Sequence, residues 1–429
     1  MRFEQHLKIL NDSHHDELFK KLYGKNQIEE NKKRYIDAIK GFEQRFGQHD
    51  IQVFSAPGRI EIGGNHTDHN NGKVLTASIN LDSIGIAIPN ASNKVTVVSE
   101  DYEQDFTINL EDLSCDQDGG TISLVKGMLE GFQKFGFSLG GFNVYVTSNV
   151  IPAAGVSSSA SFEMLICAII DSFYNKGKMS KEAYAKIGKY AENNYWNKAS
   201  GLLDQMASAI GNLITIDFKD ESHPVVEQIE IDFESSGYGV IVVNTGDGHA
   251  DLSEEYSAIP KEMKQVANYF GKQVCAEITL EDILSNLKGL RQKVSDRAIL
   301  RAIHFHHENK VVEEQLLSLK ANDFDRFLSL ITASGDSSWT MLQNCYAISN
   351  PHEQGVTLAL ALTKMFIAKI GKGACRVHGG GFAGTILAII PEEFVPAYAD
   401  YMESNFMENA IYPMVIRPYG AINISRMLK

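Results

Sequence analysis

The chain has 429 residues, of which 44% are hydrophobic and 22% are charged, the proportions of an ordinary globular protein. They exclude a disordered tail, a collagen-like repeat and a coiled coil, and the length favours two or three domains. The 54 acidic residues outnumber the 40 basic ones, for a net charge of −14. With no overall positive field, we expect neither nucleic acid nor a membrane surface as a partner.

The cysteines and the amino-terminal sequence indicate a cytoplasmic protein. The five cysteines are widely spaced, form no CxxC pair and are odd in number, which favours reduced thiols over a disulfide framework or a zinc site. The first residues contain no apolar core of signal-peptide length. The longest apolar run, residues 164–170, is too short to cross a bilayer.

A predicted helical extension is followed by a mixture of strands and helices. Aromatic and aliphatic residues recur at three- and four-residue spacing up to Gly47, which is a plausible helix end. Short apolar or alternating runs predict strands at 51–54, 83–88, 95–99, 142–147, 239–243 and 385–390. Longer apolar patterns predict helices at 161–174, within 280–330, at 356–370 and at 392–406.

This order of elements predicts the fold class and the domains. Strands and helices mix without a strict βαβ rhythm, which favours α+β layers over a doubly wound parallel sheet. An acidic, polar stretch at 216–236 interrupts the pattern and is the expected boundary. We therefore predict a helical extension at 1–47, an amino-terminal domain at 48–220 and a carboxy-terminal domain at 221–429.

The first segment with chemical character is 55–75, which follows a predicted strand. It gathers many polar side chains within eleven positions: Arg59, Glu61, Asn65, His66, Asp68 and His69. So many donors and acceptors, with so little apolar filler, suit the recognition of a polyhydroxylated ligand. The alternative is a polar surface loop with turn chemistry at 70–72.

The second segment, 152–161, lies between a predicted strand and a predicted buried helix. Its small residues let the backbone approach a ligand, and N–H groups at a helix N-terminus form an anion site. Serine hydroxyls at the same place can reach Mg²⁺. The segment is not the GxxxxGK[ST] phosphate loop, which the sequence lacks. The alternative is an ordinary serine N-cap.

The third segment, 376–384, is rich in glycine and flanked by strands. Gly379, Gly381 and Gly384 match GxGxxG, but the dinucleotide motif needs a helix after it and a strand is predicted here. His378 and the next three glycines resemble the oxyanion segment of esterases, but no GxSxG nucleophile follows. The remaining interpretation is a tight glycine turn that approaches a ligand or another loop.

Further polar residues lie outside these three segments. Glu192 and Asp204 stand twelve positions apart, and the alternative to a functional pair is a helix end followed by a buried, capping aspartate. Histidines cluster at 14–15 and 304–307. A metal site is possible there in principle, but no supporting carboxylate pattern accompanies either cluster, so we expect none.

Together, in order and spacing, the three segments resemble the three signatures of the GHMP kinases. The first is similar to the galactokinase signature GRxNLIGEHTDYNxGxVL and is here GRIEIGGNHTDHNNGKVL, residues 58–75. The second resembles GGGLSSSAS, with Ala153 and Ala154 in place of the first two glycines, and the third resembles GGGFGG. The resemblance covers about 45–429 and implies a two-domain α+β fold with the active site in the cleft between the domains.

The resemblance also implies an activity, ATP-dependent phosphorylation of the anomeric hydroxyl of a hexose, with Mg²⁺. Asp204, in a segment similar to GIMDQ, matches the catalytic aspartate, and Arg59 matches the arginine beside it. Ser159 and Glu192 match the magnesium ligands. The implied ATP-binding residues are Ala153, Ala154, Gly155, Val156, Ser157, Ser158 and Ser159. The implied sugar contacts are Arg59, Asn65, His66, Asp68, Gly201, Asp204 and Tyr256.

Several positions depart from the galactokinase pattern. Asn65 stands where those enzymes carry glutamate, Glu61 where they carry asparagine, His69 at a usual tyrosine and Thr121 at a tryptophan near the adenine. D-galactose is the favoured substrate, with galacturonate or N-acetylgalactosamine as the alternative. A non-catalytic sugar sensor is disfavoured, because the serine–alanine segment and both carboxylates are present. We expect a monomer or a weak homo-oligomer.

Overall fold

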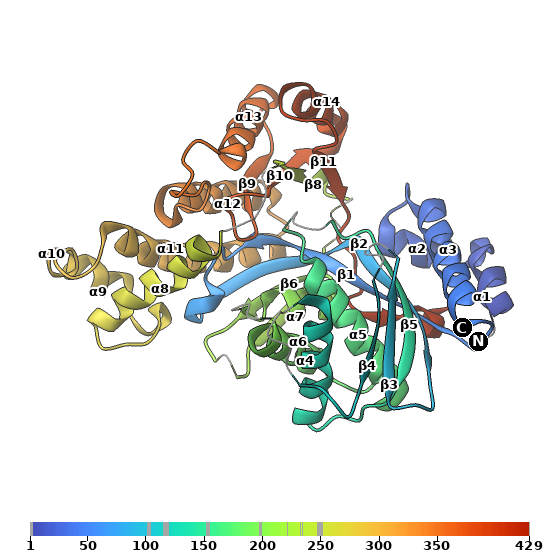
Figure 1. The fold of residues 1–429 in the computed structure, drawn as a ribbon. Helices are drawn as coiled ribbons and strands as arrows, with labels where there is room; N and C mark the ends of the chain where they lie inside the picture. Colours follow the sequence, from blue (N-terminus) through green and yellow to red (C-terminus); the bar gives the residue numbers. More distant parts are fainter. Residues whose placement is uncertain are drawn as a thin grey trace.

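Two β-sheets with helices packed against them organise the chain (Figure 1). The computed structural model describes residues 3–100, 104–114, 120–151, 155–196, 200–220, 222–231, 233, 235–246 and 252–428. Within these residues the first sheet has eight strands and the second has four. Most strand pairs are antiparallel, which confirms the predicted α+β class.

The first sheet is built on two long antiparallel strands, β1 (Gln52–Gly63) and β2 (Lys73–Pro89). Its other strands are β3 (Lys94–Ser99), β4 (Gln104–Asn109), β5 (Phe142–Ser148), β6 (Leu213–Asp217), β7 (Val225–Ile229) and β12 (Ile422–Asn423). The register of β1 against β2 shifts just before Arg59 and just after Glu61. Such shifts re-aim side chains, here at the two charged residues of the strand.

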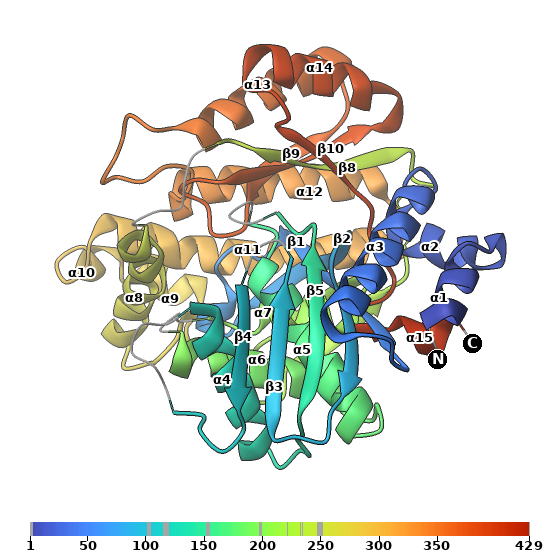
Figure 2. The ribbon, with the colours of Figure 1, turned by 45° about the vertical axis from the view of Figure 1, so that its right-hand side comes forward.

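Helices cover both faces of this sheet (Figure 2). One layer contains α1 (Phe3–Leu10), α2 (Asp16–Tyr23) and α3 (Ile28–Phe46), and the other contains α4 (Gly120–Lys134), α5 (Ser158–Tyr174), α6 (Lys181–Tyr195) and α7 (Leu203–Ile210). Successive strand residues point to opposite faces, so Val53 packs with the first layer and Phe54 with the second. As predicted, α3 ends at Gly47.

The second sheet carries the glycine-rich segment between two of its strands. These strands are β8 (Tyr238–Asn244), β9 (Ala374–His378), β10 (Thr385–Pro391) and β11 (Ile411–Met414). One face packs against α13 (Gly355–Ile370) and α14 (Val395–Asn405). The other face shares a core with α12 (Phe324–Ser337) and with β1 and β2. This shared core fixes β1 relative to the glycine-rich turn.

A further helical layer lies beside the first sheet. It contains α8 (Ser253–Tyr269), α9 (Leu280–Ser285), α10 (Leu287–Leu290) and α11 (Asp296–Lys320). The remaining short elements are η1 (Ser13–His15), η2 (Asp68–Asn70), η3 (Cys275–Glu277), η4 (Ser338–Leu342), η5 (Glu392–Phe394) and α15 (Ile424–Met427). Figure 1 shows α8 and α11 next to the end of β1.

The first sheet differs from the sequence prediction in two ways. The strand predicted at 51–54 continues to Gly63, and β2 begins at Lys73. Most of segment 55–75 is therefore strand and not the polar surface loop that was its alternative interpretation. Composition misled here because the polar side chains of β1 find their partners on distant segments. The predicted boundary at 220 falls between β6 and β7, which pair with each other, and β12 returns to pair with β1.

The thiols and the helix lengths agree with the sequence analysis where the structure describes them. Cys167, Cys275, Cys345 and Cys375 are buried and free, and Cys115 lies outside the described residues. In the described part of the chain, no helix combines the length and the apolar character needed to cross a membrane.

Candidate active site

The three sequence signatures meet at the second half of β1. The backbone N–H of Arg59 donates to the carbonyl of Val156 at 3.1 Å, and its guanidinium donates to the carbonyl of Gly155. Asn65, on the connection after β1, donates from Nδ2 to the carbonyl of Gly379 at 2.7 Å. A Cβ placed on Gly379 would lie 3.5 Å from the Gly155 carbonyl oxygen, so the second and third segments are also in contact.

Asp204 is held by one arginine and one serine. Arg59 donates from Nε at 2.9 Å and from Nη2 at 2.7 Å to Oδ1 of Asp204, and Ser157 donates to Oδ2 at 2.5 Å. Asp204 stands in the first turn of α7, where the helix dipole favours negative charge. Its side chain is 29% exposed, against 8% for Arg59. The carboxylate is therefore oriented from within the protein and still open to a ligand.

The loop before α5 has an unusual backbone. Ser157 has φ +60° and Gly155 has φ +66°. A left-handed conformation costs a serine free energy, and such strain gathers at ligand-binding loops. Ser157 is the N-cap of α5 but makes no capping hydrogen bond with its side chain. The serine-cap alternative is therefore wrong for Ser157, whose hydroxyl is bound to Asp204.

A second group of carboxylates lies next to this loop. Ser159 donates from Oγ to Oε1 of Glu192 at 3.1 Å. Gln205 donates from Nε2 to Oε2 of Glu192 at 3.0 Å and to Oε2 of Glu163 at 3.2 Å. Both glutamates are buried. Hydroxyl and carboxylate oxygens are the ligands that hard divalent cations take, so Ser159 and Glu192 could hold one.

The predicted sugar contacts lie against one another and against the glycine turn. A Cβ placed on Gly201 would lie 2.1 Å from Oδ2 of Asp68, so this approach requires glycine at 201. His66 donates from Nε2 to one carbonyl of the glycine turn at 2.9 Å, and the Tyr256 hydroxyl donates to the next at 3.0 Å. Burial, followed by His69, lowers the pKa of His66 to about 3, and burial raises the pKa of Tyr256 to about 12. His66 and Tyr256 are therefore neutral at pH 7.

Asn65 is fully buried and makes all the hydrogen bonds that its amide can make. Its Nδ2 donates to Oε1 of Glu61 at 2.8 Å as well as to Gly379. Its Oδ1 accepts from Asn344 Nδ2 at 2.8 Å and from Ser338 Oγ at 3.3 Å. In this arrangement the amide joins the connection after β1 to the glycine turn and to η4.

Two buried histidines support the same region in the neutral form. His378 accepts the backbone N–H of Glu61 on Nε2 at 3.1 Å, so its proton lies on Nδ1 and is donated to Thr385 at 3.1 Å. Burial, then the nearby Arg59, lowers the pKa of His378 well below its usual value. His304 donates from Nε2 to the Asn65 carbonyl at 2.9 Å, and burial lowers its pKa too.

The histidine clusters do not form metal centres. Among the described residues, no group of three or more His, Cys, Asp or Glu side chains is placed to hold a metal ion. His304, from the cluster at 304–307, is hydrogen-bonded to protein through both ring nitrogens, with Ser337 as the second partner.

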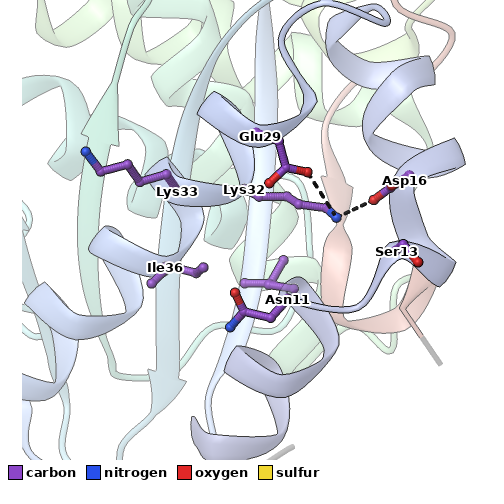
Figure 3. A pocket seen from close by; sticks show the side chains of 8 residues that line it. Asn11, Ser13, Asp16, Glu29, Lys32, Lys33 and Ile36 are labelled. Carbon is purple, nitrogen blue, oxygen red and sulfur yellow. Dashed lines mark hydrogen bonds and ion pairs between the residues drawn. The ribbon is translucent and has the colours of Figure 1, made fainter.

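A cavity of about 270 Å³ lies away from the signatures, among the amino-terminal helices (Figure 3). Lys32 lies there between Asp16 and Glu29. The lysine charge is already balanced by carboxylates of the chain, and no signature residue lines the cavity. The candidate active site is therefore the region around Asp204.

Some functional residues lie outside the prediction or outside the described chain. Ala153 and Ala154 fall in residues that the structure does not describe. Sequence reasoning did not select the supporting residues of the site: Glu163, Gln205, His304, Arg376 and His378. Glu163 and Gln205 adjoin predicted residues in sequence, which is a usable signal, whereas His304 offers none because its partner Asn65 is 239 positions away.

Two family models match the sequence. The galactokinase galactose-binding signature matches residues 40–89, and the GHMP kinase N-terminal domain matches residues 123–212. Arg59 lies in the first match, and Ser157, Glu192 and Asp204 lie in the second. In both regions the chain is therefore similar to the GHMP kinases.

The chain is also similar to curated and solved relatives over most of its length. It is 25% identical over 368 residues to the galactokinase of Clostridium tetani, covering 86% of this chain and 91% of that protein. It superposes on Lactococcus lactis galactokinase, solved with galactose, with a TM-score of 0.77 at 23% identity, covering 89% and 97% of the chains. Methanococcus jannaschii mevalonate kinase gives 0.59 at 16%, covering 86% and 98%. These likenesses confirm the predicted fold.

Proposed function

We propose that this chain is an ATP-dependent sugar-1-kinase with D-galactose as its substrate. The observation that carries the proposal is the ion pair between Arg59 and Asp204, located where the galactose-binding signature meets the loop before α5. The proteins named galactokinase that resemble this chain do so over most of its length.

In the proposed reaction Asp204 is the proton acceptor. The anomeric hydroxyl oxygen attacks the γ-phosphorus of ATP, its proton passes to Asp204, and the bond from phosphorus to the departing ADP oxygen breaks. Arg59 orients the carboxylate and sets positive charge beside the transferring phosphoryl group. Phosphoryl transfer needs little more from the protein than position and charge, and this arrangement can supply both.

The ATP phosphates are proposed to bind along residues 153–159. The N-terminus of α5, a 17-residue helix, directs its first N–H groups and its dipole at this loop. Ser159 and Glu192 fit a magnesium ion, because both present oxygen atoms and these lie 3.1 Å apart. When bound, Mg²⁺ neutralises part of the phosphate charge.

The sugar is proposed to contact Arg59, His66, Asp68, Gly201 and Tyr256. The Asp68 carboxylate accepts hydrogen bonds and is proposed to select among ring hydroxyls, including the axial one that distinguishes galactose from glucose. We propose that Asn65 supports the sugar-binding residues without contacting the sugar, since its amide is already fully hydrogen-bonded.

The test is ADP release measured with ATP, Mg²⁺ and a panel of galactose, glucose, galacturonate and N-acetylgalactosamine. We expect turnover of galactose well above glucose, with galactose 1-phosphate as the product. If galacturonate or N-acetylgalactosamine is turned over far better, galactose is the wrong substrate and the sugar-1-kinase class stands. Binding of sugar and ATP without ADP release from any sugar would instead identify a non-catalytic sensor.

We also propose a cytoplasmic protein that is a monomer or a weak homo-oligomer and that binds neither nucleic acid nor membranes. The net charge of −14 supports the absence of polyanionic partners. Sedimentation over a range of protein concentrations tests the oligomeric state, and cell fractionation tests the location.

A further inference from the structure

Glu61 is a buried residue of β1 that is hydrogen-bonded to the second sheet. Its Oε1 accepts hydrogen bonds from Asn65 Nδ2 at 2.8 Å and from Arg376 Nη2 at 3.1 Å. Its backbone N–H donates to Nε2 of His378 at 3.1 Å. Glu61 is 5% exposed and Arg376 is fully buried. Since Arg376 and His378 both lie on β9, these contacts join β1 to the strand that leads into the glycine turn.

Arg376 depends on the charge of Glu61. Within the described part of the chain, Glu61 is the carboxylate that forms an ion pair with Arg376. Nη1 of Arg376 has no hydrogen-bond partner among the described residues, so the guanidinium is otherwise poorly compensated. A buried charge that loses its partner is strongly destabilising. Neutralising Glu61 therefore leaves a buried cation just before the turn at 379–381.

The residues at 61 and 65 are chemically reciprocal. One supplies a carboxylate that only accepts, and the other supplies an amide that donates to it. A glutamate at 65 beside Glu61 would set two carboxylates face to face and would remove the donor to Gly379. An asparagine at 61 together with a glutamate at 65 restores one donor and one acceptor. The galactokinase signature has these two residue types in the opposite order, as the sequence comparison above shows.

We propose that Glu61 is a positioning residue of this kinase and that Glu61 and Asn65 act as one unit, which holds Arg376 and the glycine turn against the sugar-binding segment. Glu61 acts through this turn, whose carbonyls accept from His66 and Tyr256. The kinetic consequence rests on the proposed function. Misplacing the turn disturbs His66 and Tyr256 directly, whereas the loop before α5 is also held by Arg59 and Asp204. The effect on the sugar contacts is therefore expected to be the larger one.

The test is a double-mutant cycle of Glu61→Asn, Asn65→Glu and the exchange variant that carries both. Each single change is expected to raise the KM for galactose about tenfold and the KM for ATP less than about twofold. The exchange variant is expected to return to within about threefold of the wild-type galactose KM. Glu61→Gln, which keeps the size and removes the charge, is expected to match the single variants, and Glu30→Gln, on an exposed part of α3, is the control.

Each outcome decides the proposal. The proposal is overturned if the two single changes raise the galactose KM additively. It is also overturned if the galactose KM of the exchange variant is as high as that of the worse single variant. Equal rises in the KM for galactose and for ATP also overturn it, because they indicate general loosening. If the wild type turns over no sugar, the proposed function fails. The same variants are then compared by their melting temperatures instead of their KM values. Recovery of the melting temperature in the exchange variant supports the unit, and its absence overturns it.

Discussion

Asp82 on β2 and Asp204 on α7 each bind an arginine and a serine hydroxyl. Asp82 is fully buried, and both of its oxygens accept hydrogen bonds from side chains on other segments. These partners are Tyr23, Arg34, Ser55 and Arg417. Asp204 binds Arg59 and Ser157 and keeps 29% of its side chain exposed.

The difference between these two sites is the exposure of the carboxylate. A carboxylate enclosed by four side chains can only support the fold, because no proton or ligand reaches it without breaking several bonds. A carboxylate held on one side by Arg59 and Ser157 keeps an open approach, as a proton acceptor requires. Residue types alone, aspartate with arginine and serine, do not distinguish a functional site from a structural one.

The largest effect is expected at Asp204. Asp204→Asn should reduce kcat with galactose by on the order of 10²- to 10⁴-fold, since the positioned proton acceptor is lost. Calorimetry should show that ATP still binds, and thermal unfolding should show an intact fold. A folded Asp204→Asn protein with near-normal turnover removes this residue from the mechanism. Asp204 would then have no functional role to distinguish it from the structural Asp82.

Asp82→Asn should give the opposite pattern. It leaves the buried Arg417 and the partly buried Arg34 without a carboxylate, and we expect the free energy of unfolding to fall by about 3–5 kcal/mol. The galactose KM of the protein that remains folded should be unchanged. Urea unfolding and kinetics measure the two quantities, with Asp37→Asn, on the exposed surface of α3, as the matched control. A stable Asp82→Asn protein with a raised galactose KM contradicts the structural role.

The metal side of the site predicts a smaller effect. Glu192→Gln should raise the Mg²⁺ concentration for half-maximal rate by about tenfold, because one anionic ligand becomes neutral. Ser159→Ala should raise it by less. A Mg²⁺ titration measures both, and Glu100→Gln, exposed at the end of β3, is the control. Unchanged titrations in both variants place the ion elsewhere.

The buried histidines predict the smallest effect, on stability at mildly acid pH. The pKa values of His304 and His378 are lowered on folding, so the unfolded chain binds more protons below pH 6.5 and stability falls as the pH falls. His378, whose pKa lies well below its usual value, should cost roughly 0.7 kcal/mol between pH 7 and pH 6, and His304 should cost no more than that. Urea unfolding at both values should show a smaller loss in His378→Gln than in the wild type. His223→Gln, at an exposed position, should leave the loss unchanged, and an equal loss in His378→Gln refutes the assignment.

Local patterns predict local structure well in this chain. The helix that ends at Gly47, the strand at 142–147 and the buried helix at 161–174 follow from residue spacing and all appear in the structure. The extension of β1 to Gly63 could not be predicted in this way. Its polar residues are stabilised by partners far away in sequence, as for Glu61 and Arg376, which are 315 positions apart.

The candidate active site could be proposed from the sequence only through the resemblance to a family. No periodicity relates Arg59 to Asp204, which are 145 positions apart and meet because β1 and α7 pack in one domain. The hydrogen bonding of Asn65 was beyond prediction as well. It depends on η4, a five-residue π-helix packed against α11 and α12.

The pairing of β12 with β1 has a consequence for biosynthesis. Phe54 and Ser55 of β1 pair with Asn423 and Ile422, and the two marked ends of the chain lie side by side in Figure 1. A ribosome therefore releases the strand that carries Arg59 hundreds of residues before its outer neighbour. Until residue 423 emerges, the nascent chain has an open strand edge, the kind of surface through which chains aggregate. A translation product that stops before residue 422 keeps this edge and is a substrate for chaperones rather than a working kinase.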